Sequence, residues 1–305
     1  MHHLALVYLC GLPNAYYGGH RFLEGRDAPV QNQAERLWAA IARGRRKKLI
    51  YVTGDTHGEV SRFEELKRKY FLSKKDTLIV AGDFGCIFGM GRRDEAKLDV
   101  LAALPYTILF LDGNHECFPE IFTYPEEMWN GGRIHRIRPN VLHLMRGQVY
   151  DLNGLTVFTM GGGYSIDVMY RTPGRTLWPE EMPGDAEYAE AWENLKRHGG
   201  KVDVIISHTA PEQAMQLFTE TGVIRNRFPQ EMKLNLFLEE VRQKVAHRHY
   251  YFGHMHVDQR LSGNMTALYY DVYHLETGRK ATAWGDVGEL SPEFDWGEPQ
   301  GDEVW

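Results

Sequence analysis

The sequence predicts an α/β or α+β sandwich, in which two sheets pack together and helices cover their outer faces. Short apolar runs rich in β-branched residues alternate with stretches of helical periodicity over most of the chain. The chain has 305 residues, of which 43% are hydrophobic and 25% are charged, and this is the composition of a globular protein with a sizeable core. The sequence contains no internal repeat and no low-complexity tract.

Each element is predicted from local spacing and from breaker residues. Pro105 ends one helix, and Asn153-Gly154 is typical of a tight hairpin turn. Apolar stripes at helical spacing consist of Val60, Phe63, Leu66 and Tyr70, and of Leu234, Leu238, Val241 and Val245. The other predicted helices are 33–42, 93–103, 185–198 and 211–218. The predicted strands are 49–53, 77–81, 106–111, 141–145, 148–152, 155–160, 202–207, 250–252 and 267–274.

The chain divides into three parts. Residues 1–47 form an N-terminal extension with a helix and a basic linker, residues 48–285 form the main domain, and residues 286–305 form an acidic tail. The segment 43–48 has five basic residues in six, which is consistent with a solvated linker or with a contact to phosphate or nucleic acid.

Composition limits the possible classes of protein. The net charge of −6 gives no general reason to expect a nucleic-acid partner. Three cysteines at long spacings argue against a disulfide framework or zinc ribbon and favour a reducing compartment, so we expect a cytoplasmic protein. We expect no membrane helix, because no run of 18 apolar residues occurs. The apolar stretch 4–12 lacks the flanks of a signal peptide.

Polar side chains follow five of the predicted strands, at the point where each strand ends. In α/β folds, binding sites form where the carboxyl ends of strands converge. Carboxylate, amide and imidazole groups together suit Mn²⁺, Fe or Zn²⁺. The sequence therefore predicts a shared metal site. The residues at these five ends are Asp55 and His57, Asp83, Asn114 and His115, His208, and His254 and His256.

The order of these motifs resembles that of the calcineurin-like metallophosphoesterase superfamily, and the resemblance extends from about residue 48 to 274. It implies a four-layer α/β/β/α sandwich with two metal ions at the strand ends. It also implies roles for individual residues. Asp55, His57 and His256 resemble ligands of the first metal, Asn114, His208 and His254 resemble ligands of the second, and Asp83 resembles the carboxylate that bridges both.

The resemblance also implies a mechanism. Two divalent cations, Mn²⁺ in the first place and Fe or Zn²⁺ as alternatives, would hold a hydroxide that attacks phosphorus in line. His115 resembles the histidine near the leaving group, and we expect it to act as general acid. The acid that orients His115 is open, and Glu116 is one candidate.

Two features differ from the common pattern. Cys86 replaces the second acid of the motif Gly82-Asp83-Phe84-Gly85-Cys86, which disfavours a serine/threonine protein phosphatase; we expect Cys86 to be a small buried residue. The stretch 161–167 resembles a segment of an uncharacterised bacterial and phage branch of the superfamily. We expect the nearby Arg171, or Arg175, to contact substrate phosphate; the alternative is a tight turn with a surface arginine.

The sequence thus predicts a phosphodiesterase or phosphatase acting on small or nucleotide substrates. A serine/threonine-type protein phosphatase, a nuclease and a non-catalytic metal-binding scaffold are the alternatives. Nucleic acid is possible as a partner but not favoured, no membrane partner is expected, and the oligomeric state is open.

Overall fold

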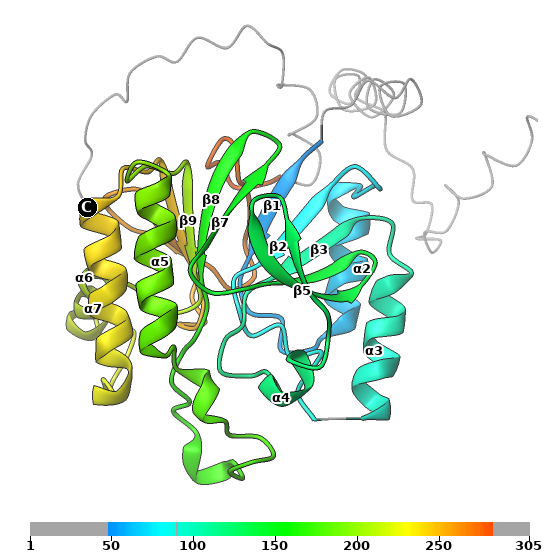
Figure 1. The fold of residues 1–305 in the computed structure, drawn as a ribbon, viewed down its shortest axis with the longest axis horizontal. Helices are drawn as coiled ribbons and strands as arrows, with labels where there is room; N and C mark the ends of the chain where they lie inside the picture. The colour runs from blue at the N-terminus through cyan, green and yellow to red at the C-terminus, as the bar shows by residue number, and fades with distance from the viewer. Residues whose placement is uncertain (1–47, 90, 283–305) are drawn as a thin grey trace, which may run out of the picture.

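The computed structural model describes residues 48–89 and 91–282, which form two mixed sheets flanked by helices. Figure 1 shows the two sheets side by side, with helices on both outer sides. The predicted fold class is therefore confirmed. The predicted helix 33–42 and the acidic tail 286–305 lie outside the described residues.

The first sheet has seven strands, and its central strands β1, β2, β3 and β6 run parallel. Antiparallel strands lie at both edges. In spatial order the strands are β13 (Val272–His274), β1 (Ile50–Thr53), β2 (Thr77–Val80), β3 (Thr107–Phe110), β6 (Val141–Leu144), β5 (Gly132–Arg138) and β4 (Glu126–Trp129).

The second sheet has six strands with the same design, parallel in the middle and antiparallel at the edges. In spatial order they are β11 (Gln259–Arg260), β12 (Met265–Ala267), β10 (His249–Phe252), β9 (Val204–Ser207), β8 (Leu155–Met160) and β7 (Gln148–Leu152). The turn Asn153-Gly154 joins β7 to β8, and both residues have positive φ, as the hairpin prediction requires.

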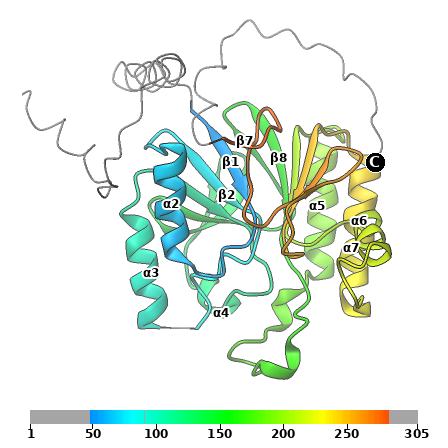
Figure 2. The same ribbon diagram turned by 180° about the vertical axis from the view of Figure 1, so that it is seen from behind.

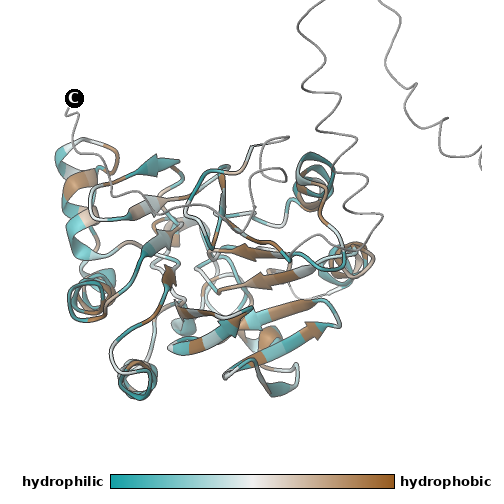
Figure 3. Cartoon of the chain, turned by 90° about the horizontal axis from the view of Figure 1, so that it is seen from above, coloured by the Kyte–Doolittle hydropathy of each residue, from teal (hydrophilic) through white to brown (hydrophobic). Residues whose placement is uncertain are grey.

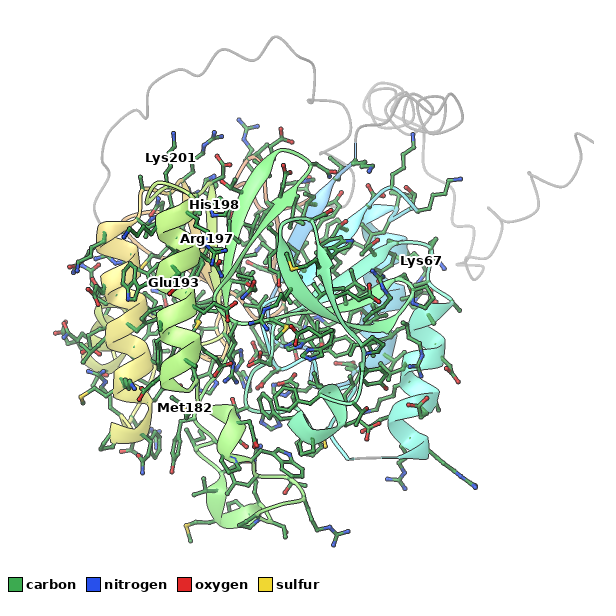
Figure 4. All side chains as sticks on the ribbon, viewed as in Figure 1. Lys67, Met182, Glu193, Arg197, His198 and Lys201 are labelled. Carbon is green, nitrogen blue, oxygen red and sulfur yellow. The ribbon has the colours of Figure 1, made fainter. Side chains whose placement is uncertain are left out.

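Helices cover the two outer faces, as Figure 2 shows from behind. The first sheet carries α2 (Val60–Tyr70) and α3 (Arg92–Ala102), and the short α4 (Phe118–Ile121) follows β3. The second sheet carries α5 (Asp185–Arg197), α6 (Glu212–Glu220) and α7 (Pro229–Lys244). Charged side chains such as Glu193 and Arg197 of α5 are largely exposed, and Lys67 of α2 is partly exposed; Figure 4 labels all three.

Side chains point alternately to the two faces of each strand, and the buried ones form three apolar layers. In β1, Ile50 and Val52 belong to the cluster between the sheets, whereas Tyr51 packs with Phe63 of α2 in the cluster under the first pair of helices. A strand that is covered on both faces is apolar throughout, which explains why the central strands read as continuous hydrophobic runs. Figure 3 shows these hydrophobic strands between more hydrophilic helices.

The prediction of one strand over 267–274 is wrong. The segment contains the end of β12 and all of β13, which belong to different sheets, and residues 268–271 carry the chain between them. Also unpredicted are the β4–β5 hairpin, β11 and α4.

Two further expectations concern the described residues. Cys86 is wholly buried, as expected for a small core residue, and Cys86 and Cys117 are free thiols. Within residues 48–89 and 91–282, each helix is too short or too polar to cross a bilayer.

Candidate metal centre

The carboxyl ends of five strands meet where the two sheets adjoin. Three of these strands, β1, β2 and β3, belong to the first sheet, and β9 and β10 belong to the second. These ends face the bottom of Figure 1, where the loop between β8 and α5 protrudes. The strand ends carry Asp55, Asp83, Asn114, His208 and His254, so the structure brings the predicted residues together.

One group of possible metal ligands consists of Asp55, His57, Asp83 and His256, whose ligand atoms lie within 4.8 Å of one another. The Nε2 atoms of His57 and His256 are 2.9 Å apart, and His256 Nε2 is 3.2 Å from Asp55 Oδ2. The other nitrogen of His57, Nδ1, is 3.9 Å from Asp83 Oδ2. Two carboxylates and two imidazoles therefore surround one point.

A second group shares Asp83 with the first and adds His208 and His254. His208 Nε2 lies 3.4 Å from Asp83 Oδ1 and 3.3 Å from Asn114 Oδ1. The Asn114 amide nitrogen donates to Ser165 Oγ at 3.2 Å, which turns its carbonyl oxygen toward His208. Asp83 thus lies between the two groups, as the resemblance implies for a bridging carboxylate.

Hydrogen bonding shows that the second group fits a cation. His208 Nδ1 lies 2.9 Å from the carbonyl of Ala81 and must donate to it, so in the neutral ring Nε2 carries a lone pair. That lone pair faces two other acceptor oxygens, from Asp83 and Asn114. Three converging acceptors without a proton between them repel one another, and a divalent cation would satisfy all three.

The backbone is strained at the same place. His57, Asp83, His254 and His256 all have φ between 46° and 64°, the left-handed region that residues with a side chain rarely adopt. Such conformations cost about 1–3 kcal/mol each and persist where the surrounding structure fixes them. Four such residues lie among the candidate ligands, which indicates that the surrounding structure fixes the conformation of these loops.

The loops at the strand ends approach each other so closely that position 113 must be a glycine. A Cβ on Gly113 would lie 2.2 Å from Asp83 Oδ1 and 2.5 Å from His208 Nε2, which no side chain could tolerate. At Gly82, where φ is +90°, a Cβ would lie 2.1 Å from His208 Nδ1. The loops thus pack to backbone distance, and the ligand groups close around the site.

Charge and burial act in opposite directions on the central ligands. Burial alone would raise the pKa of Asp83, but the neighbouring histidines lower it to about 2. Burial alone would lower the pKa of His254, but Glu231 and two aspartates raise it to about 9. Asp83 therefore stays ionised, and the three carboxylates around His254 favour positive charge at that position.

His115 lies beside the ligand groups and contacts Arg171. The Arg171 guanidinium donates through Nε to Asp167 at 2.7 Å, and through Nη1 to the carbonyls of Asn114 at 2.6 Å and Thr176 at 3.2 Å. Its Nη2 donates to His115 Nε2 at 2.7 Å. Arg171 is 9% exposed, so the alternative of a surface arginine is wrong, whereas Arg175 is exposed.

The surroundings of His115 favour its neutral form. Burial lowers its pKa, Asp83 opposes this, and Arg171 lowers it further, to a value of about 4. His115 Nε2 lies 3.9 Å from Asp83 Oδ2. The neutral ring therefore accepts from Arg171 at Nε2 and carries its proton on Nδ1.

The structure adds residues that sequence reasoning missed. Glu231, in the first turn of α7, places Oε1 3.3 Å from His254 Nε2 and accepts the backbone N–H of Tyr164 at 3.1 Å. Ser165 holds Asn114 and belongs to the glycine-rich stretch that the sequence singled out without a role. No local signal marks Glu231, because only the packing of α7 brings it to the site.

Glu116 has a structural role. Its carboxylate accepts the backbone N–H groups of Phe84 at 2.7 Å, Gly85 at 3.3 Å and Gly113 at 2.6 Å. It thereby ties the loop after β2 to the loop after β3. The partner of His115 in this structure is Arg171 rather than this acid.

Fold and site together define a metal-dependent hydrolase of the α/β class, with ligands drawn from two sheets. The family model of calcineurin-like phosphoesterases matches residues 48–258. The chain belongs to this family, and it is accordingly a metal-dependent phosphoester hydrolase.

Solved structures with some likeness include the phosphopantetheinyl hydrolase of Mycobacterium tuberculosis, with 14% identity and a TM-score of 0.39 over 82% of this chain and 99% of that one. A protein of unknown function from Aquifex aeolicus has 15% identity and a TM-score of 0.29 over 54% of this chain and 82% of its own. At such TM-scores neither likeness bears on the substrate. No curated protein matches this chain.

Proposed function

We propose that the chain hydrolyses small or nucleotide phosphoesters with two divalent cations, Mn²⁺ in the first place. The observation that carries the proposal is the pair of overlapping ligand groups that share Asp83. Asp55, His57, Asp83 and His256 would hold one cation, and Asp83, Asn114, His208 and His254 the other. Bound cations would supply an activated water and neutralise charge on the phosphoryl oxygens.

The protein's own residues orient the substrate and move a proton. His115 is the proposed general acid for the leaving oxygen. A protonated ring carries a hydrogen on both nitrogens, but in this structure Nε2 accepts the hydrogen bond from Arg171. We propose that an incoming phosphate takes over the Nη2 donor of Arg171. The negative charge of the phosphate would at the same time raise the pKa of His115 and allow protonation. Arg171→Gln should then raise KM about tenfold, and an unchanged KM would remove Arg171 from this role.

The central experiment compares Mn²⁺-loaded protein on p-nitrophenyl phosphate and bis(p-nitrophenyl) phosphate, with and without a chelator. The proposal expects turnover that the chelator abolishes and that Asp83→Asn removes, together with at least one bound metal. Asp99→Asn, on the exposed face of α3, is the matched control and should behave as wild type. A wild-type protein that holds two Mn²⁺ ions without turnover would instead support the non-catalytic scaffold.

The other fine points stay predictions. Buried Cys86 at the place of an acid supports a small substrate over a phosphoprotein. A nuclease would lose binding steeply as salt rises, because it needs many phosphate contacts. The cytoplasmic location and the choice of Mn²⁺ over Fe or Zn²⁺ also stay predictions, and metal analysis of purified protein tests the latter.

A further inference from the structure

A row of six aromatic rings crosses the metal centre. Neighbouring ring centroids are 5.7, 4.7, 4.9, 4.7 and 4.1 Å apart. The row runs in the order Phe88, His115, His57, His256, Tyr269 and Tyr270. The two candidate metal-ligand histidines lie in its middle, so His115 and Phe88 continue the row from His57, and Tyr269 and Tyr270 continue it from His256.

The tyrosine end of the row is built rigidly. Both oxygens of the Asp258 carboxylate accept backbone N–H groups, from Tyr269 at 2.7 Å, Tyr270 at 2.9 Å and Asp271 at 2.8 Å. Arg62 donates to the carbonyls of Asp55 and Tyr269, and its guanidinium lies 5.1 Å from the centre of the Tyr270 ring. These bonds fix the crossing between the two sheets to the loop that carries a metal ligand.

The tyrosine end is also open. Tyr270 is 59% exposed and the His256 side chain is 49% exposed, although the Asp55 carboxylate that contacts His256 is buried. An exposed tyrosine on an anchored loop loses little side-chain freedom when a planar group stacks on it. The second ring, Tyr269, stacks on His256 with an angle of 15° between the planes and extends this surface toward the ligands.

The order of the rings indicates which substituent of a bound phosphoester lies at each end of the row. His115, the proposed acid, lies near Phe88, so the leaving group belongs at that end. We infer that Tyr269 and Tyr270 form a stacking platform for a planar aromatic group on the substituent that stays bound to phosphorus. A monoester has no such substituent, so the platform selects phosphodiesters that carry a nucleobase or another aryl ring. This inference rests on the proposed function and narrows its substrate class.

The test uses two diesters with the same leaving group. One is the p-nitrophenyl ester of thymidine 5′-phosphate, and the other is methyl p-nitrophenyl phosphate, which has no ring on the retained side. The readout is the ratio of kcat/KM for the thymidine ester to kcat/KM for the methyl ester. Tyr270→Leu should lower this ratio about tenfold, within the range for one lost base–aromatic stack, whereas Tyr270→Phe should keep it. Phe122→Leu, another exposed ring, is the control.

If the ratio in Tyr270→Leu is within twofold of the wild-type ratio, the proposed platform is refuted, but the proposed hydrolase activity is not. If wild type turns over neither ester nor p-nitrophenyl phosphate, the proposed function fails, and calorimetric binding of the two esters to the Mn²⁺-loaded protein decides on the platform separately. Turnover of p-nitrophenyl phosphate alone would refute the selection of diesters. Equal affinities for the two esters, or equal losses in Tyr270→Leu, would refute it. Melting temperatures of all variants establish that each is folded.

Discussion

Replacing Glu231 by glutamine tests whether a residue outside the motifs sets the metal affinity. Glu231 is 3% exposed, and its Oε1 lies 3.3 Å from His254 Nε2. A carboxylate in this position accepts Nε2–H, which leaves Nδ1 of His254 to carry the lone pair for a cation. Glutamine retains the shape and one acceptor oxygen but loses the charge. We therefore expect a folded protein whose His254 is held less firmly and is a weaker base.

The size of the effect follows from that contact. Loss of a carboxylate that orients a ligating histidine costs about 10–100-fold in metal affinity, or about 1.4–2.7 kcal/mol. Only the affinity of the proposed site at Asp83, His208 and His254 should be lower, because Glu231 contacts His254. The affinity of the proposed site that contains His57 and His256 should be unchanged.

Calorimetric titration of metal-free protein with Mn²⁺ resolves the two sites and measures this difference. Glu240→Gln, on the same helix and paired with Lys244 at the surface, is the control and should bind as wild type. Two sites of wild-type affinity in Glu231→Gln would refute the reasoning. A loss confined to the first ligand group would equally refute it, since that group lies beyond the reach of this contact.

Three other predictions follow from the geometry. Gly113→Ala should lose at least one metal and 100-fold or more in activity, because its Cβ would lie 2.2 Å from Asp83 Oδ1; full metal content by atomic absorption would contradict this. His115→Gln should keep both metals but lose about 10²–10⁴-fold in kcat, and unchanged turnover would exclude the general acid. Burial and then His143 lower the pKa of His135 from 6.5 to about 4, so the native state keeps it neutral and the free energy of unfolding should fall as pH drops from 6.5 to 4. In His135→Gln that fall should be smaller by about 1–2 kcal/mol in urea titrations, and an identical fall would show that His135 does not contribute.

Most of the sandwich could be predicted because its central strands are short apolar runs between clear breaks. Ile50–Thr53 and Val204–Ser207 are buried on both faces and read as strands without ambiguity. The β4–β5 hairpin was not predicted, because Glu126–Trp129 is an edge strand without a buried residue and Gly132–Arg138 mixes arginines with its buried residues, so neither segment is an apolar run. The crossing at 268–271 was not predicted, because an apolar run in the sequence does not show which sheet its residues join.

That the candidate ligands lie together could be predicted because each of them follows a strand, and the ends of parallel strands meet. Asp55 and Asp83 therefore carry a positional signal in the sequence. Glu231 and Tyr270 carry none, since a glutamate in a helical first turn and a tyrosine in a loop are common at any surface. Their importance depends on how α7 and the 268–271 crossing pack against the strand ends, which is a property of the tertiary structure alone.

The division of ligands between the sheets has a consequence for how the protein matures. Three members of the first group come from loops of one sheet and His256 from the other, while His208 and His254 join Asp83 across the same seam. A nascent chain that has emerged only as far as β6 therefore has three of the four candidate ligands of the first group, but only Asp83 and Asn114 of the second. Under the proposed function, binding of both ions would require β10 to have docked, and the bound ions would then link two parts of the chain that are synthesised at different times.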